Sequence, residues 1–287
     1  MKRRVGFIGL GDQGAPMASA IATRHHLQAW ARRDASYASL GDVSFDKASD
    51  PRELACNVEI LCLCLPGDAE VRQLLLQSGV ADALPAGAVV INHSTGDPIE
   101  AAKLAEALGI KKLGFLDAPV SGGHSGAVAR TLTCFVGGLD ETLESCRDVI
   151  ACHSARIALM GPPGSGQMTK LINNVLTVSN MRNIVEAFSL AKAAGVNLVA
   201  LQGALADSSG GSFILQAIGR QIRPEIADHI AQLNRKDVAE FAEAMRRQGL
   251  NPRQIEAWAM LGPDGLASLV ADMSSSSDET PEISVIE

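Results

Sequence analysis

The sequence predicts a two-part α/β fold, in which a doubly wound domain built on a parallel sheet is joined by one long helix to an all-helical domain. Short apolar runs typical of buried strands alternate with helical segments through the first 160 residues. A glycine-rich turn follows the first apolar run. After residue 166 only helical patterns follow, and they are separated by Gly or Pro.

The composition of the 287 residues argues against several classes of partner. The net charge of −7 disfavours nucleic acid and anionic membrane surfaces, and no apolar run reaches the ~18 residues of a transmembrane helix. The basic start at Met1 precedes an apolar run that is too short for a signal peptide. The six cysteines show neither a C-x-x-C pair nor zinc-binding spacing, so we expect no metal site and a reducing, cytoplasmic location.

The first strand, predicted at Arg4–Ile8, runs into the pattern G-x-G-x-x-G and then into a helical segment. This context is typical of dinucleotide binding. Gly9 permits a tight turn, Gly11 lets backbone N–H groups approach a diphosphate, and Gly14 lets the helix pack closely on the strand. A purely structural turn is the alternative. The expected cofactor contacts in this turn are Gly9, Leu10, Gly11, Asp12, Gln13 and Gly14.

The end of the second strand, predicted at 26–31, is where an NAD-binding chain carries Asp or Glu for the ribose 2′-hydroxyl. Arg32 and Arg33 stand there instead, and a guanidinium suits a 2′-phosphate. We therefore favour NADP(H) as the cofactor. Two solvated surface arginines are the alternative, and Asp34 keeps NAD(H) possible.

Further strands are predicted at 58–65, 88–92 and 113–117, with helices between them. Asp50 and Asp97 each precede a proline and start a helix as N-caps. Polar turns follow two of the strands, at the carboxyl ends where such sheets bind ligands. The residues that we expect to contact the cofactor there are Leu65, Pro66 and Thr95.

A second glycine-rich stretch, at 118–126, is expected to be a loop whose N–H groups point at an anion such as a carboxylate. An ordinary flexible turn is the alternative. A strand at 131–138, a helix at 141–151 and a strand at 155–160 follow. The Gly- and Pro-rich segment 161–166 allows neither helix nor strand and marks a boundary. The predicted parts are a cofactor domain at 1–163, a helical domain at 164–273 and an acidic tail at 274–287.

The long helix opens at about Gly166, and Lys170 and Asn174 lie four residues apart on one of its faces. A solvated face is the plain interpretation. Because the boundary lies just before this helix, the two side chains would instead be an acid/base and a hydrogen-bond anchor at a cleft.

Four motifs in this order resemble the β-hydroxyacid dehydrogenases, a family that includes 3-hydroxyisobutyrate dehydrogenase, tartronate semialdehyde reductase and glyoxylate/succinic semialdehyde reductase. The motifs are the glycine turn Gly9 to Ala18, the stretch Asp117 to Gly123, Gly164 to Gln167 with Lys170 and Asn174, and the pair Lys236-Asp237.

The resemblance implies a Rossmann domain, a long inter-domain helix and the reversible, nicotinamide-dependent oxidation of a 3-hydroxy acid to a semialdehyde. It makes Lys170 the catalytic acid/base, with desolvation and the helix N-terminus favouring its neutral form. It places Lys236 near the nicotinamide and the substrate, and it makes Arg32 an arginine that accompanies NADP. The implied substrate-binding residues are Ser121, Gly122, Gly123 and Asn174.

Three departures leave the identity of the small carboxylate substrate open. Arg130 stands where the family usually has glycine, His124 replaces a small or apolar residue, and His229 stands near a position that is more often aromatic. His124 is also a competing acid/base, because histidine titrates near neutrality.

Other functions remain as alternatives. An imine reductase would lack the lysine, and a 6-phosphogluconate-type dehydrogenase would carry Glu where this chain has Val175. A non-catalytic dinucleotide-binding sensor is the third alternative. The long apolar helices predict a homodimer or homotetramer.

Overall fold

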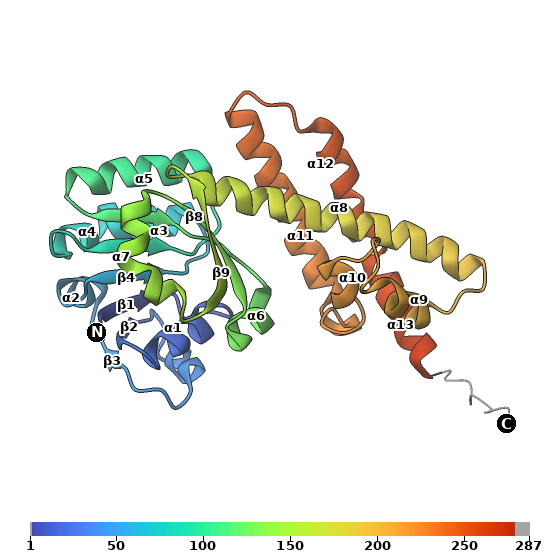
Figure 1. Ribbon diagram of the computed structural model, residues 1–287, viewed down its shortest axis with the longest axis horizontal. Coiled ribbons are helices and arrows are strands. Elements are labelled where there is room, and N and C mark those ends of the chain that lie inside the picture. The colour runs from blue at the N-terminus through green and yellow to red at the C-terminus, as the bar shows by residue number, and fades with distance from the viewer. Residues whose placement is uncertain (1, 279–287) are drawn as a thin grey trace. The chain divides into compact units, whose positions relative to one another are not determined.

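One large sheet organises the first part of the chain (Figure 1). The computed structural model describes residues 2–278, and within them nine strands form a sheet that starts in the order β3-β2-β1-β4-β5-β6, with parallel pairing. This is the strand order of the doubly wound dinucleotide-binding fold. The strands are β1 (Arg4–Ile8), β2 (His26–Trp30), β3 (Asp46–Lys47), β4 (Ile60–Leu63), β5 (Val89–Asn92), β6 (Gly114–Asp117), β7 (Val120–Ser121), β8 (Leu132–Gly137) and β9 (Ser154–Gly161).

The sheet is mostly parallel, as predicted, with one exception. Strand β8 pairs antiparallel with β6 and β7, and parallel with β9. The connection from Ser121 to Leu132 contains only the short helix α6 (Gly123–Ala129). A parallel crossover needs a dozen or more residues, so the chain returns here as an antiparallel strand.

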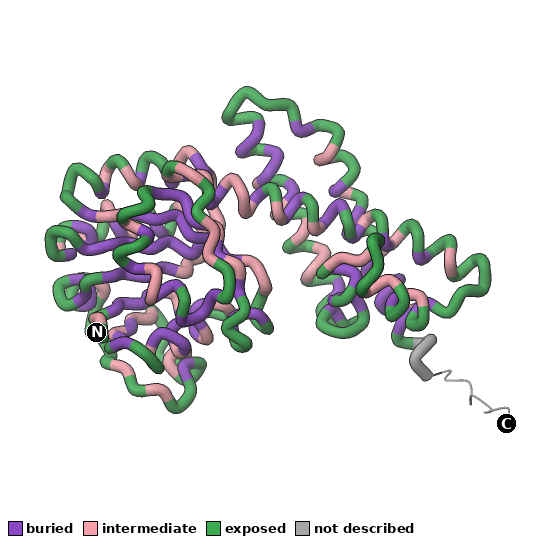
Figure 2. The backbone as a smooth tube through the Cα atoms, viewed as in Figure 1, coloured by how far each residue is buried: buried purple, intermediate pink, exposed green. Residues whose placement is uncertain are grey.

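Both faces of the sheet are buried at its central strands β1, β4 and β5, which explains why these strands are continuous apolar runs (Figure 2). Val5 and Phe7 belong to a hydrophobic cluster shared with α1, α6 and α7, whereas Leu61 and Leu63 belong to a second cluster shared with α2, α4 and α5. The helices of this part are α1 (Gly14–Ala22), α2 (Pro51–Cys56), α3 (Asp68–Arg72), α4 (Val80–Ala83), α5 (Pro98–Ile110), α6 and α7 (Asp140–Ile150), with a 3₁₀ helix η1 (Asp34–Leu40) and a π-helical turn η2 (Gln73–Gln77).

The two predicted N-caps are confirmed. The Asp50 side chain accepts hydrogen bonds from the N–H groups of Arg52 and Glu53, at 2.7 and 2.9 Å. The Asp97 side chain caps α5 in the same way. The 3₁₀ helix η1 and the two-residue strand β3 were not predicted, because neither carries a clear period.

From Leu171 onward the chain forms a second compact unit of helices. Its core includes Met181, Phe188 and Val270, all essentially inaccessible. Gly262 lets the chain pass close to α8, because a Cβ there would lie 2.6 Å from the carbonyl oxygen of Val178. The elements of this part are α8 (Ser165–Ala193), which begins in the first unit, α9 (Leu198–Leu205), α10 (Phe213–Ala217), α11 (Pro224–Arg247), α12 (Arg253–Met260), η3 (Gly262–Gly265) and α13 (Leu266–Asp278).

Two predicted boundaries need correction. The segment 161–166 is not free of regular structure, since β9 ends at Gly161 and α8 already begins at Ser165. The predicted tail at 274–287 starts too early, because α13 continues to Asp278. The rest of that tail, 279–287, lies outside the described residues. Within residues 2–278, no helix combines the length and the apolar character needed to span a membrane.

Candidate functional site

The glycine-rich turn joins β1 to α1, and close packing requires two of its glycines. A Cβ on Gly9, whose φ is +108°, would lie 2.0 Å from the carbonyl oxygen of Cys64. A Cβ on Gly14 would lie 1.8 Å from the carbonyl oxygen of Gly9. A Cβ on Gly11 would meet nothing within 4 Å, so the space above this residue is open to a ligand. The turn therefore has the cradle that a diphosphate requires.

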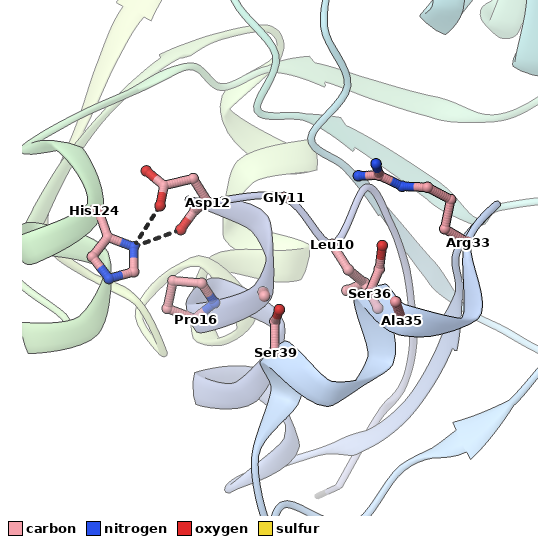
Figure 3. Close-up of a pocket in the computed structure, with 10 residues that line it drawn as sticks. Leu10, Gly11, Asp12, Pro16, Arg33, Ala35, Ser36, Ser39 and His124 are labelled. Atoms are coloured by element: carbon pink, nitrogen blue, oxygen red, sulfur yellow. Dashed lines mark hydrogen bonds and ion pairs between the residues drawn. The ribbon is translucent and has the colours of Figure 1, made fainter. Parts of the chain in front are cut away.

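A cavity of about 510 Å³ lies beside this turn (Figure 3). Arg33 stands at one side of it and His124 at the other, with Gly11 and Asp12 between them. Arg32, two residues after the end of β2 at Trp30, is not among the lining residues. The lining residues are Leu10, Gly11, Asp12, Ala15, Pro16, Arg33, Ala35, Ser36, Ser39 and His124.

Asp34, the carboxylate that could bind the ribose of NAD(H), forms an ion pair with Lys47 and does not line this cavity. Its carboxylate lies 2.8 Å from the ammonium of Lys47, which in turn lies 4.6 Å from the centre of the Tyr37 ring. Asp34 is not one of the lining residues. Ser36 and Ser39 line the cavity from η1, where a spacing of three residues puts two side chains on one face.

The turns after β4 and β5 are tied together at the carboxyl end of the sheet. The backbone N–H of Leu65 donates to the hydroxyl of Ser94 at 2.8 Å. The side chain of Gln167, fully buried at the start of α8, donates to the carbonyl oxygen of Ser94 at 2.7 Å. Its amide oxygen accepts from the N–H of Gly96 at 2.9 Å. The predicted cofactor residue Leu65 thus belongs to this hydrogen-bonded network, and Thr95 lies between Ser94 and Gly96, which both bond to Gln167.

The first turn of α8 is anchored by Asp117, the last residue of β6, whose carboxylate has no solvent exposure. It accepts from the N–H groups of Gly164 and Gln167, at 2.7 and 2.8 Å. Burial raises the pKa of Asp117 to about 6, although these backbone donors act in the opposite direction. A Cβ on Gly166 would lie 2.5 Å from the carbonyl oxygen of Asp117, so only glycine fits there.

The stretch 118–126 is not the loop that we predicted. Val120–Ser121 forms β7, and α6 starts at Gly123. The N–H of Gly126 donates to the carbonyl oxygen of Gly122, so helix formation uses one of the donors that we expected to face a ligand. Arg130 ends α6 with φ +59°, in the left-handed region, which explains why glycine is the usual residue at that position.

Lys170 is the last residue of the first unit and lies three residues after the anchored Gln167, on the same side of α8. Asn174 is buried one turn later, in the second unit. Lys236 belongs to α11 of the second unit, where its ammonium lies 3.3 Å from Glu240. His229 is exposed on the same helix.

Several residues that shape the site were given no role of their own from the sequence. Asp117 ends an apolar run, and that signal could have marked it as a buried hydrogen-bonding group, whereas Gln167 stands among small and polar residues and carries no such signal. Ser36, Ser39 and the Asp12 contact of His124 carry no local signal. Among the described residues, no group of three or more His, Cys, Asp or Glu side chains is arranged to hold a metal ion.

Comparison with protein families matches nearly the whole described chain. Residues 4–161 match the NAD binding domain of 6-phosphogluconate dehydrogenase. Residues 164–277 match the NAD-binding domain of NADP-dependent 3-hydroxyisobutyrate dehydrogenase.

Individual proteins agree with these matches. The chain is 32% identical over 253 residues to the NAD-dependent L-serine dehydrogenase of Pseudomonas aeruginosa, covering 84% of this chain and 85% of that protein. It is 31% identical over 225 residues to the 2-hydroxy-3-oxopropionate reductase of Escherichia coli, covering 76% and 75%. The structure of Mycobacterium tuberculosis 3-hydroxyisobutyrate dehydrogenase with L-serine superposes with a TM-score of 0.81 at 23% identity, covering 96% of this chain and 99% of that one.

Proposed function

The chain belongs to the 3-hydroxyisobutyrate dehydrogenase family of NAD(P)-dependent β-hydroxyacid dehydrogenases, and from this premise we propose that it transfers a hydride between NADP(H) and a small 3-hydroxy acid or its semialdehyde. The relatives act on L-serine and on 2-hydroxy-3-oxopropionate, according to their names. Both compounds are short carboxylates with a reacting group two carbons from the acid, which supports the substrate class.

The anchored start of α8 is the observation that carries this proposal. Gln167 is tied to the turn after β5 by two side-chain hydrogen bonds, and Asp117 accepts from its backbone. This end of the sheet is where doubly wound folds bind ligands. Lys170 follows three residues later on the same side of α8, which supports the proposal that its ammonium acts near the predicted cofactor turns. A lysine on a solvated surface would not need such an anchor.

In the proposed mechanism, the nicotinamide supplies or accepts the hydride when the cofactor is bound. During reduction, the Lys170 ammonium donates a proton to the oxygen of the forming alcohol, and during oxidation the neutral amine takes that proton back. The residues proposed to bind the substrate are Ser121, Gly122, Gly123, Asn174 and Lys236, on the strength of the family resemblance.

NADP(H) is the proposed cofactor because Arg33 lines the cavity while Asp34 pairs with Lys47. The guanidinium of Arg33 and the hydroxyl groups of Ser36 and Ser39 suit a 2′-phosphate. The relatives include an NAD-dependent enzyme, so the cofactor has to be measured for this chain.

We also propose that the protein forms a homo-oligomer and that it works in a reducing compartment. Large apolar side chains are exposed on the helical unit, among them Leu176, Leu190 and Phe213. All six cysteines are free thiols.

The test of catalysis is the Lys170→Ala variant, assayed with L-serine, 3-hydroxyisobutyrate and 2-hydroxy-3-oxopropionate by the absorbance of the reduced nicotinamide. We expect turnover to fall about 10²- to 10⁴-fold, the contribution of a general acid/base, with NADPH binding retained. Lys192→Ala is the matched control, because Lys192 is an exposed lysine on the same helix that pairs with Asp272. Near-normal turnover of Lys170→Ala would end the assignment of the base, and no turnover of any substrate by the wild type would favour a non-catalytic protein.

A further inference from the structure

His124 connects two segments that both line the cavity beside the glycine turn. Its Nδ1 lies 2.8 Å from the carbonyl oxygen of Asp12 and 3.1 Å from the carboxylate Oδ1 of the same residue (Figure 3). His124 is the second residue of α6, and Asp12 lies in the turn before α1. The histidine therefore links the glycine-rich stretch at 118–126 to the proposed cofactor turn.

The two contacts determine which nitrogen of His124 carries a hydrogen. A carbonyl oxygen can only accept a hydrogen bond, so Nδ1 must donate. In its imidazolium form, in which both nitrogens carry a hydrogen, the ring is a cation in direct contact with the Asp12 carboxylate.

Asp12 is an unexpected residue for a phosphate-binding turn. Its neighbours Gly11 and Ala15 line the same cavity, and the N-terminus of α1 favours anions there. A carboxylate at this place opposes a bound diphosphate by like-charge repulsion. Arg33 stands at the other side of the cavity, so His124 is the lining residue that can place a positive charge beside the Asp12 carboxylate (Figure 3).

We propose that His124 neutralises Asp12 and so allows the glycine turn to accept the diphosphate of the dinucleotide. His124 is then a positioning residue for cofactor binding, acting through Asp12. This inference rests on the proposed dinucleotide binding. It also gives a reason for a histidine at a position where the family resemblance leads us to expect a small or apolar residue.

The expected effect is modest and depends on salt. The side chains of Asp12 and His124 are 79% and 57% exposed, so the pair is well solvated. Surface ion pairs of this kind change an equilibrium by up to about fivefold, and they weaken strongly at about 1 M salt, where the screening length is about 3 Å. We therefore expect His124→Val to raise the Kd for NADPH about three- to fivefold in low salt, and to have little effect in high salt.

The experiment is a double-mutant cycle in which NADPH is titrated into the wild type, His124→Val, Asp12→Asn and the double variant at low and high salt. The double variant should bind NADPH as tightly as Asp12→Asn does, because no carboxylate is left to neutralise. His26→Val is the matched control, since His26 is an exposed histidine at the start of β2. Thermal melting of each variant reports whether it is folded.

Two results would overturn the inference: a Kd of His124→Val equal to that of the wild type at low salt, or a double variant that binds as weakly as His124→Val. The second result would mean that the imidazole acts without Asp12. A wild type that binds neither NADPH nor NADH would overturn the proposed function as well, so the two failures are distinguishable.

Discussion

Replacing Gln167 with methionine tests the joint that holds the start of α8. The two side chains have similar length and volume, so the change removes hydrogen bonds without opening a cavity. The fully buried Gln167 bonds to the carbonyl oxygen of Ser94 and the N–H of Gly96. Methionine cannot donate to the carbonyl oxygen, and its thioether is only a weak acceptor for the N–H.

The magnitude follows from the burial of the two abandoned partners. Ser94 is buried, so its unsatisfied carbonyl oxygen costs about 1–3 kcal/mol. Gly96 is half-buried and its N–H can bond to water instead, so losing its hydrogen bond to Gln167 costs about 0.5–1.5 kcal/mol. We expect the free energy of unfolding to fall by about 1.5–4.5 kcal/mol in total.

The assay is urea unfolding of the wild type, Gln167→Met and Gln77→Met, combined with steady-state kinetics. Gln77 is an exposed glutamine of the same unit, and its replacement should change the free energy of unfolding by less than about 0.5 kcal/mol. Because Gln167 orients the turn that carries Lys170, kcat should fall by about tenfold or more while the Kd for NADPH changes little. A loss of stability below about 1 kcal/mol, or an unchanged kcat, would refute this account of the joint.

Two further predictions concern the cofactor and the response to acid. Arg33→Ala should raise the KM for NADPH about tenfold or more and leave the KM for NADH nearly unchanged. Arg32→Ala should raise the KM for NADPH less. A larger increase for Arg32→Ala than for Arg33→Ala would make Arg32 the ligand of the 2′-phosphate. Burial lowers the pKa of His93 to about 4 and that of His153 well below its usual value. Below about pH 6.5 the unfolded chain therefore binds protons that the folded chain does not. The free energy of unfolding should fall between about pH 6.5 and pH 4, by on the order of 3 kcal/mol for His93 alone. The raised pKa of Asp117 acts in the opposite sense between about pH 4 and 6, so the test compares the pH slopes of urea unfolding in the wild type and in His93→Asn, and equal slopes would contradict it.

Much of the fold could be predicted because it depends on local pattern. The strand at Arg4–Ile8 was placed to the residue, and the caps at Asp50 and Asp97 lie where the sequence indicated. In each case, apolar periodicity or a short-range side-chain bond determines the local conformation. The same holds for Gly9 and Gly14, whose spacing is a steric requirement of the strand–turn–helix unit.

The candidate site was predictable only in part. Leu10, Gly11 and Asp12 of the glycine turn line the cavity together with Arg33, whereas the roles of Lys170 and Lys236 stay predictions. Ser36 and His124 were not expected beside this cavity, because contact between η1, α6 and the turn depends on packing. Sequence spacing contains no information on which neighbouring arginine will face inward.

The sequence by itself determined the alternation of strands and helices, the long helix α8 and the glycine cradle, since these follow from side-chain period and from backbone sterics between near neighbours. Only the tertiary structure decided that β8 returns antiparallel and that Gln167 reaches back 73 positions to Ser94. It also decided that His124 meets Asp12 across 112 positions. Such contacts form when distant segments are brought together by burial of their apolar faces, and the local chain does not encode which polar atoms will then meet.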